Sequence, residues 1–392
     1  MPTTDFTSKL LELKEAIITN LEQNNETIKI YFRLQRRDHV CPCCGAITNK
    51  VHDYRTSEIR DIPIQGKKTL LIYSKRRYHC DSCNKHFYET FAHTGKGCRT
   101  THRLAFYAIH LLCDHQSVHA VAGHLGISDS YIFRRMKNVK FPKPKTLPQV
   151  LSIDEFKGNA GGQKFQAILT DPKNHKVLDI LKSRTQTTLI DYFKPYQNRK
   201  NVTHFVMDMN YAYREFAESF FPNAKIVIDK FHVVRYVTWA LENVRKRVQK
   251  EMHPDRRKYF KRSRRLLLTH KEKLKEDSLS ALAVMLSLSE DLATAYHLKE
   301  CFYEFISSKN RSEAERRLRK FILATEVSQL TEFKATLTML SNWSKYILNA
   351  FDCNYTNGFT EGTNNKIKVV KRNAFGYRNF NNFRNRILLA CN

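Results

Sequence analysis

The spacing of hydrophobic and polar positions changes several times along the chain. Between Phe6 and Leu21, apolar residues recur three or four positions apart, which predicts a short amphipathic helix. From 28 to 88 the residues alternate in short runs, as in 28–32 and 69–73, which predicts a small β-rich module. We therefore expect residues 1–95 to form an N-terminal region of one helix and several strands.

The pattern becomes helical between residues 101 and 138, inside a region that we place at 96–140. It is followed by a segment from Lys140 to Pro148 in which prolines stand among lysines. Prolines at this density favour an extended chain, so this segment is predicted to be a linker and a domain boundary.

The segment that follows the linker alternates between strand and helix patterns. The predicted strands are 150–154, 164–170, 176–182, 203–208 and 224–229, and the predicted helices are 187–196, 211–221 and one that begins at 231. Three successive strands, followed by strands that alternate with helices, predict a mixed α/β sheet. We place this domain at 149–245, and expect the one or two helices of 350–392 to belong to it.

Residues 246–349, between these two parts, have a polar helical pattern with no predicted strand. The fold class is therefore α+β multidomain, with an all-helical insertion in the α/β domain.

The charge of the chain indicates its partner. Of the 392 residues, 67 are Lys or Arg and 38 are Asp or Glu, which gives a net charge of +29. The hydrophobic content of 42% is that of a folded protein, so the positive charge lies on a folded surface and predicts binding to nucleic acid. The sequence has no apolar run long enough for a membrane span and no signal-peptide pattern, so we expect a soluble cytoplasmic protein.

Half of the ten cysteines lie between residues 41 and 83. Cys41 with Cys44, and Cys80 with Cys83, form two C-x-x-C pairs, a spacing that lets two thiolates occupy adjacent corners of a tetrahedron around Zn²⁺. We predict a structural zinc site with these four ligands. A redox pair or free buried thiols are the alternative, and Cys43, His79 and His86 are alternative ligands for one position.

Residues 118–136 have the pattern of a helix-turn-helix. A short helix ends at Gly126, and a second helix begins after Ser128, a favourable N-cap residue. If the second helix enters the major groove of double-stranded DNA, its contacts come from Ser130, Tyr131, Arg134 and Arg135. The alternative is an ordinary helical hairpin.

Two aspartates follow predicted strands of the large domain. Asp154 closes the strand that begins at Val150, and Asp208 closes the strand that begins at Thr203. Carboxylates at the ends of neighbouring strands repel each other unless cations bridge them, and Mg²⁺ or Mn²⁺ is suited to oxygen ligands. Two such ions are a common device for phosphodiester cleavage.

Glu361 is the candidate for a third carboxylate. No acidic residue follows it, and the helix after it has four basic residues that we expect to bind DNA phosphates: Lys366, Lys368, Lys371 and Arg372. Taken singly, each aspartate also reads as a turn former, and Glu361 as a helix N-terminal charge. Taken together on a strongly basic chain, the three acids predict a metal-dependent nuclease site.

These motifs resemble, essentially end to end, the transposases of the ISL-three family of bacterial insertion sequences. Besides the two cysteine pairs and the helix-turn-helix, the matching segments are Ser152-Ile-Asp154-Glu, Val206-Met-Asp208-Met, Asp229-Lys-Phe-His232-Val-Val and Glu361-Gly-Thr-Asn-Asn-Lys-Ile-Lys368. The resemblance implies a ribonuclease H-like core, a DDE triad of Asp154, Asp208 and Glu361, and a helical insertion before the glutamate. Asp229 and His232 match an acid-x-x-His motif, in which His232 contacts the scissile phosphate or orders Asp208, or merely packs at a helix start.

The implied function is binding to the inverted repeats of a mobile element, followed by strand cleavage and strand transfer, by a homodimer acting at the bacterial nucleoid. A DNA-binding regulator derived from a transposase, without catalysis, is the alternative from another class. A structure-selective nuclease without strand transfer is a third.

Overall fold

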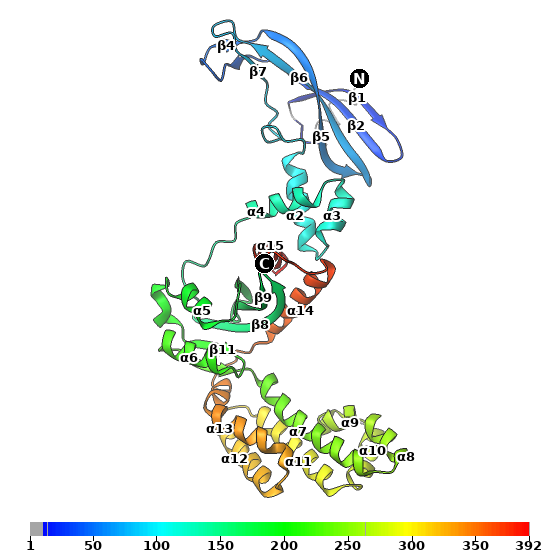
Figure 1. Cartoon of the computed structure of the whole chain (residues 1–392), viewed down its shortest axis with the longest axis vertical. Helices are drawn as coiled ribbons and strands as arrows, with labels where there is room; N and C mark the ends of the chain where they lie inside the picture. The colour runs from blue at the N-terminus through cyan, green and yellow to red at the C-terminus, as the bar shows by residue number, and fades with distance from the viewer. Residues whose placement is uncertain (1–10, 14, 263, 392) are drawn as a thin grey trace. The chain divides into compact units, whose positions relative to one another are not determined.

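The computed structural model describes residues 11–13, 15–262 and 264–391 (Figure 1). These residues divide into two compact units: the first comprises the chain up to Phe141 together with Lys368–Cys391, and the second comprises Pro142–Ile367. The sequence pattern places all of 350–392 with the α/β domain, whereas the structure assigns Lys368–Cys391 to the first unit. No helix in the described ranges combines the length and the apolar character needed to cross a membrane.

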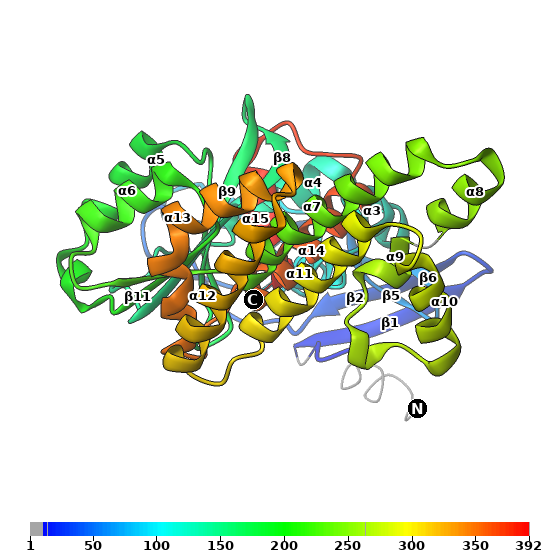
Figure 2. The same ribbon diagram turned by 90° about the horizontal axis from the view of Figure 1, so that it is seen from below.

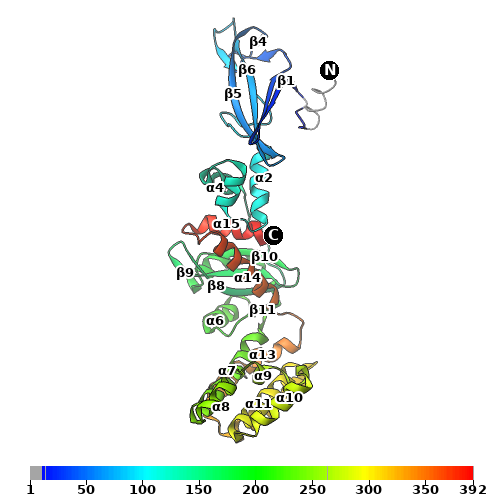
Figure 3. The ribbon, with the colours of Figure 1, turned by 90° about the vertical axis from the view of Figure 1, so that its right-hand side faces the viewer.

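The first unit contains a five-stranded sheet in the order β1-β2-β6-β5, with β7 paired to β6. Its strands are β1 (Ala16–Gln23), β2 (Thr27–Leu34), β5 (Val51–Ile64), β6 (Lys67–His79) and β7 (His86–Tyr88), and a separate hairpin is formed by β3 (His39–Val40) and β4 (Ile47–Thr48). Figure 3 shows β5 and β6 as the long hairpin of this sheet. The predicted strands 28–32 and 69–73 are confirmed, and the stacked rings of Phe32 and Tyr73 lie in the core, 4.9 Å apart.

The predicted N-terminal helix is wrong over the residues that the structure describes. Residues 16–21 lie in β1, which pairs antiparallel with β2, while Phe6 and Leu10 lie outside the described residues. Ala16 and Ile18 are buried, whereas Ile17 and Leu21, which suggested helical spacing, are 40% and 49% exposed. The burial therefore follows the two-residue period of a strand rather than the period of a helix.

Four helices complete the first unit: α2 (His102–Cys113), α3 (Val118–Leu125), α4 (Asp129–Asn138) and α15 (Phe380–Cys391). Thr101, Ser117 and Ser128 cap the first three, each accepting a hydrogen bond from a backbone N–H in the first turn. The buried Arg386 of α15 donates a hydrogen bond of 2.9 Å to the carbonyl of Gln116. The final helix of the sequence therefore packs against helices near the middle of the first unit.

The second unit is built on a five-stranded mixed sheet in the order β10-β9-β8-β11-β12. The strands are β8 (Val150–Ala160), β9 (Gln163–Asp171), β10 (Lys176–Leu181), β11 (His204–Met207) and β12 (Lys225–Ile228). β8, β9 and β10 are antiparallel, and β11 runs parallel to both β8 and β12. The predicted mixed sheet is confirmed, except that β8 continues six residues beyond Asp154.

Helices flank this sheet and form the predicted insertion. Next to the sheet lie α5 (Gln186–Phe193), η1 (Gln197–Asn201) and α6 (Tyr211–Phe220), and the insertion follows with α7 (Lys230–Glu251), α8 (Pro254–Arg262), α9 (Arg264–Leu268), η2 (Lys271–Lys273), α10 (Glu276–Leu286), α11 (Glu290–Ile306), α12 (Arg311–Ser328), η3 (Thr331–Phe333), α13 (Lys334–Leu348) and η4 (Asn349–Phe351). Figure 2 shows α7, α11, α12 and α13 as neighbours. Helix α14 (Gly358–Asn373) then begins in the second unit and ends in the first.

Candidate active site and zinc site

The four predicted thiols come together in the first unit. The Sγ atoms of Cys41, Cys44, Cys80 and Cys83 all lie within 4.8 Å of one another, and the pairs 41–83 and 44–80 are each 3.5 Å apart. Ligands around a tetrahedral zinc with Zn–S bonds of about 2.3 Å are about 3.8 Å apart, so this donor set fits the ion. Cys43 is exposed and, like His79 and His86, is not a member of this group.

Two equivalent turns bring the thiols together. Gly45 and Asn84, each the residue after the second cysteine of a pair, have positive φ angles of 78° and 59°. In each turn the N–H of the first cysteine donates a hydrogen bond to the carbonyl five residues later, at 2.8 Å for Cys41 and 2.9 Å for Cys80. The N–H groups of Cys44 and Cys43 lower the pKa of the Cys41 thiol to about 6, which favours the thiolate that zinc binds.

The predicted helix-turn-helix region consists of α3, a turn with Gly126 at a φ of 65°, and α4. Ser130 and Arg134 are exposed on α4. Tyr131 and Arg135 are half-buried: the hydroxyl of Tyr131 lies 2.7 Å from that of Thr100, and the guanidinium of Arg135 lies 4.9 Å from the ring centroid of Tyr131. Within the first unit, only Ser130 and Arg134 of the four predicted contacts therefore point freely to solvent.

In the second unit, strand register aligns three acidic residues. Ser152 pairs with Val206, so Asp154 and Asp208 each lie two residues beyond a paired position on parallel neighbours. Met207 pairs with Ile228, and the N–H of Asp229 donates to the carbonyl of Met207 at 3.1 Å, so Asp229 follows in line on the next strand. Parallel pairing therefore delivers three carboxylates to one edge of the sheet.

A buried polar network attaches the start of α14 to this sheet. The hydroxyl of Ser152 donates to Oδ1 of Asn357 at 2.6 Å, and the hydroxyl of Thr360 lies 2.8 Å from that of Thr170. Asn364, three residues after Glu361, donates from Nδ2 to Oδ2 of Asp154 at 2.8 Å. The turn of α14 that contains Glu361 is therefore held next to the aspartates.

Glu361 lies with Asp229 and His232. One ligand atom from each of these three residues lies within 4.8 Å of the others, a spacing that could hold a metal ion. Among the described residues, Asp154 and Asp208 belong to no group of this kind, so the three acids predicted from sequence do not form one by themselves. The sequence singled out His232 and left the roles of Asp229 and His232 open, whereas the structure groups Asp229, which follows β12, with His232 and Glu361.

Burial and neighbouring charges shift the pKa values of these residues. Burial raises the pKa of Asp154 to about 6, and the charge of Asp208 contributes to the rise. Burial raises the pKa of Asp208 as well, and the carboxylate of Asp229 raises the pKa of His232. The atom Oδ1 of Asp208 is buried and has no hydrogen-bond partner in the described parts of the chain, whereas Oδ2 of Asp229, also buried, lies 3.5 Å from Nδ1 of His232. Buried carboxylate oxygens without partners are stabilised by a proton or a metal ion.

The basic residues after Glu361 follow the helix into the first unit. Lys366, Lys368 and Arg372 are exposed, and Lys371 is half-buried.

A family model for ISL3 transposases matches residues 151–387, which is more than half of the chain. The chain belongs to the ISL3 family of transposases. A second family model, described as the zinc finger of the transposases of IS204, IS1001, IS1096 and IS1165, matches residues 37–83, which include all four zinc ligands.

Two proteins are similar to this transposase. The transposase for insertion sequence element IS1001 from Bordetella parapertussis is 28% identical over 367 residues, which is 91% of this chain and 90% of that protein. A protein from Lactococcus lactis subsp. lactis named an ATP-dependent protease is 34% identical over 108 residues, which is 27% of this chain and 32% of that protein. The first likeness extends over both units, and the second is local.

Sequence reasoning missed the polar residues that position the acids of the transposase. Asn364 was part of a matching motif, but no sequence spacing connects it to Asp154, 210 residues away. The same holds for Ser152, Asn357 and Thr360. Composition could have pointed to them. Four polar residues recur three or four positions apart, on one side of the helix, where an amphipathic helix that packs on a core usually has apolar residues: Asn357, Thr360, Thr363 and Asn364.

Proposed function

We propose that this protein is a DDE transposase that binds the terminal inverted repeats of its insertion sequence, cleaves DNA at the element ends and transfers the strands to a target. In this proposal Asp154, Asp208 and Glu361 are the catalytic triad of a ribonuclease H-like core. The strand order β10-β9-β8-β11-β12, with three antiparallel strands followed by two parallel ones, supports that fold. The IS1001 relative is named for its insertion sequence element, which supports the same kind of substrate here.

One observation carries the proposal: the hydrogen bond of 2.8 Å between Asn364 and Asp154. It joins the helix of Glu361 to the strand whose register aligns Asp154 with Asp208. The bond attaches the helix of Glu361 to Asp154, and strand register places Asp208 on the neighbouring strand. An arrangement of this kind costs stability in a protein that does not use it, because buried carboxylates lose their hydration.

The residues fit divalent metal ions. Carboxylate oxygens suit Mg²⁺ or Mn²⁺, and one of them, the buried Oδ1 of Asp208, has no hydrogen-bond partner among the described residues. Asp154, Asp208 and Glu361 would hold the ions, with Asp229 beside Glu361. When bound, such ions lower the pKa of a water or 3′-hydroxyl and stabilise the leaving oxygen of a phosphodiester. Asn364 orients Asp154, and His232, whose pKa is raised by Asp229, holds a proton that it can donate in a hydrogen bond to the scissile phosphate.

The first unit would recognise DNA. A zinc-stabilised module and the α3–α4 helices, with Ser130 and Arg134 exposed, would contact the terminal repeats, and Tyr131 and Arg135 would support them from beneath. Lys366, Lys368, Lys371 and Arg372 would bind backbone phosphates. Because each neutralised phosphate releases counterions, binding should weaken steeply as salt concentration rises. We propose a homodimer, since two element ends must be held together.

The test is cleavage of a labelled duplex that contains the terminal repeat, in the presence of Mg²⁺. Replacing Asp208 by Asn should lower the cleavage rate by at least about a thousandfold, because a neutral amide binds the cation poorly. Asp191→Asn, which alters an exposed acid of α5, is the matched control and should keep the full rate. Full activity of Asp208→Asn would remove this residue from the triad.

The same assay addresses the alternatives. A wild-type protein that binds the repeat tightly but never cleaves it would be a regulator derived from a transposase. A protein that cleaves without producing joined strands would be a nuclease.

A further inference from the structure

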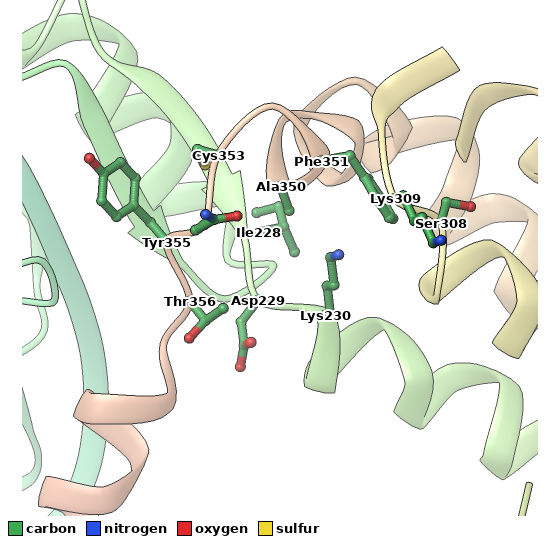
Figure 4. A pocket seen from close by; sticks show the side chains of 11 residues that line it. Ile228, Asp229, Lys230, Ser308, Lys309, Ala350, Phe351, Cys353, Tyr355 and Thr356 are labelled. Atoms are coloured by element: carbon green, nitrogen blue, oxygen red, sulfur yellow. The ribbon is translucent and has the colours of Figure 1, made fainter. Parts of the chain in front are cut away.

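A cavity of about 230 Å³ lies beside the candidate active site, within the second unit. It is far larger than the roughly 30 Å³ occupied by one water molecule. Its wall comes from the junction of β12 and α7, from the turn between α11 and α12, and from the segment after α13 (Figure 4). Asp229, at its edge, also belongs to the group formed with His232 and Glu361.

The cavity has a cation with no acidic partner. Lys230 is half-buried, and its Nζ lies 3.7 Å from the centroid of the Phe351 ring. It forms no ion pair with any carboxylate of the described residues, and loss of hydration lowers its pKa. In Figure 4 its side chain points up toward Ala350 and Phe351, whereas the carboxylate of Asp229 points the other way.

Two further features make the cavity favourable for an anion. Lys309, an exposed residue, contributes a second cation to the lining; no ion pair joins its Nζ to a described carboxylate, and its N–H donates to Oε2 of Glu313 at 2.8 Å. Asp229, the N-cap residue of the 22-residue helix α7, makes no side-chain hydrogen bond to the first turn, so the N–H groups there are not capped by it. The positive end of this helix adds to the charge of the two lysines.

Asp229 and Lys230 are consecutive at the start of α7, so the carboxylate and the ammonium group lie on two sides of one short stretch of backbone. Phosphates of one DNA strand are separated by about 3.4 Å along the helix axis. A strand whose scissile phosphate lies over the carboxylates carries further phosphates on either side of it, and one of these would be the group that the lysines bind.

We propose that Lys230 and Lys309 bind a backbone phosphate next to the scissile one, and so fix the register of the strand in the active site. This inference rests on the proposed function. It assigns to the cavity a single phosphate of the cleaved strand, which is distinct from the general attraction of a basic surface for DNA.

The experiment uses the full-length protein and duplexes of the terminal repeat, each with one methylphosphonate at a successive position of the cleaved strand. Binding is measured by fluorescence anisotropy, and cleavage is measured with Mg²⁺. We expect one position near the cleavage site at which neutralising the phosphate weakens binding to the wild-type protein about tenfold. Lys230→Gln should bind the unmodified duplex about tenfold more weakly than the wild-type protein does. A methylphosphonate at that position should not weaken its binding further, whereas methylphosphonates at the other positions should weaken binding as they do for the wild-type protein.

The variants separate this inference from a general loss of charge. In Lys309→Gln the methylphosphonate at that position should weaken binding less than in the wild-type protein, but the difference should be smaller than in Lys230→Gln. Lys230→Arg keeps the positive charge and should show the wild-type binding at every position. Lys334→Gln, an exposed lysine of the same insertion outside the cavity, should leave the profile unchanged. Unchanged tryptophan fluorescence and zinc content would verify that each variant is folded.

A Lys230→Gln protein that retains the full wild-type profile of methylphosphonate losses would overturn the inference and leave the proposed function standing. If the wild-type protein neither binds nor cleaves the terminal repeat, the proposed function itself fails.

Discussion

The zinc site and the acidic site of this transposase are built in opposite ways. The four thiols come from two similar turns, each closed by hydrogen bonds between residues five apart or fewer. The acidic site takes its residues from β8, the ends of β11 and β12, the first turn of α7 and the start of α14. The first site is local and repeated, and the second exists only when the whole second unit is folded.

The difference extends to how each site is stabilised without its metal. Cys41 and Cys80 are buried, Cys83 is half-buried and Cys44 is exposed, and the turns that present these thiols are short. Asn364 donates a hydrogen bond to Asp154, and the buried residues Ser152, Asn357 and Thr360 bond to one another and attach α14 to β8. We infer that the zinc module needs its ion to fold, whereas the acidic site is formed in advance.

The largest expected effect is that of removing zinc. A structural zinc contributes about 10 kcal/mol or more to the folding of a small module, so Cys80→Ser should unfold the zinc module and lose the metal. Cys43→Ser is the matched control, because Cys43 lies between Cys41 and Cys44 but outside the ligand group, and this variant should retain one zinc per chain.

Zinc content by mass spectrometry and far-ultraviolet circular dichroism measure this effect. Both tryptophans, Trp239 and Trp343, lie in the second unit, so their fluorescence should stay native in Cys80→Ser. A simultaneous loss of the native fluorescence would contradict the contrast between the two sites.

The next effect concerns the pH dependence of stability in the absence of Mg²⁺. The pKa of Asp154 in the folded protein, about 6, lies above its ordinary value of 3.8. Between these values the folded state binds more protons than the unfolded state, so the free energy of unfolding should fall as pH rises from about 4 to about 6. A shift of two pKa units corresponds to about 3 kcal/mol, which is an upper bound for the effect.

Asp154→Asn removes this titration. In metal-depleted buffer at pH 7 it should be more stable than the wild-type protein, by up to about 3 kcal/mol, and the difference should vanish toward pH 4. Urea denaturation followed by tryptophan fluorescence measures the second unit alone. Equal stability at both pH values would show that burying this carboxylate has no cost.

The smallest effect on stability, although a clear one on activity, is expected for Asn364→Ala. Loss of its hydrogen bond to Asp154 should lower the free energy of unfolding by about 1–3 kcal/mol. Because residues that orient a metal ligand typically contribute 10- to 100-fold to activity, the cleavage rate should fall by about that factor. Asn365→Ala, at the exposed next position of α14, is the control, and an equal loss of cleavage in both variants would deny Asn364 its positioning role.

The same contrast explains what could be predicted from sequence. The zinc ligands could be read from spacing, because two residues between cysteines place both thiols in one turn. The sheet of the second unit could be read from alternation and strand length, and each predicted strand from 150 to 229 is present. The sequence placed Asp154 and Asp208 side by side only on the assumption that their strands are parallel neighbours. The structure shows that β8 and β11 are parallel and paired.

Other features depended on long-range packing. The spacing of Ile17 and Leu21 suggested a helix, because sequence spacing alone does not show the partner strand. Pairing with β2 makes this segment a strand, and the alternate residues Ala16 and Ile18 are buried instead. The proximity of Glu361 to Asp229 and His232, and the attachment of α14 by Asn364, follow from contacts between segments more than a hundred residues apart. No local pattern encodes such contacts, although the motifs shared with the family contain the residues that make them.

The position of α15 has a consequence for biosynthesis. Phe383, Ile387 and Leu388 are buried, and α15 packs on α2 and α4, which the ribosome produces more than 240 residues earlier. The hydrophobic face of α2 and α4 must therefore stay uncovered while the entire second unit is translated. A nascent chain would thus complete the second unit before its first unit can close, and fusions or truncations at residues 380–391 should lower solubility.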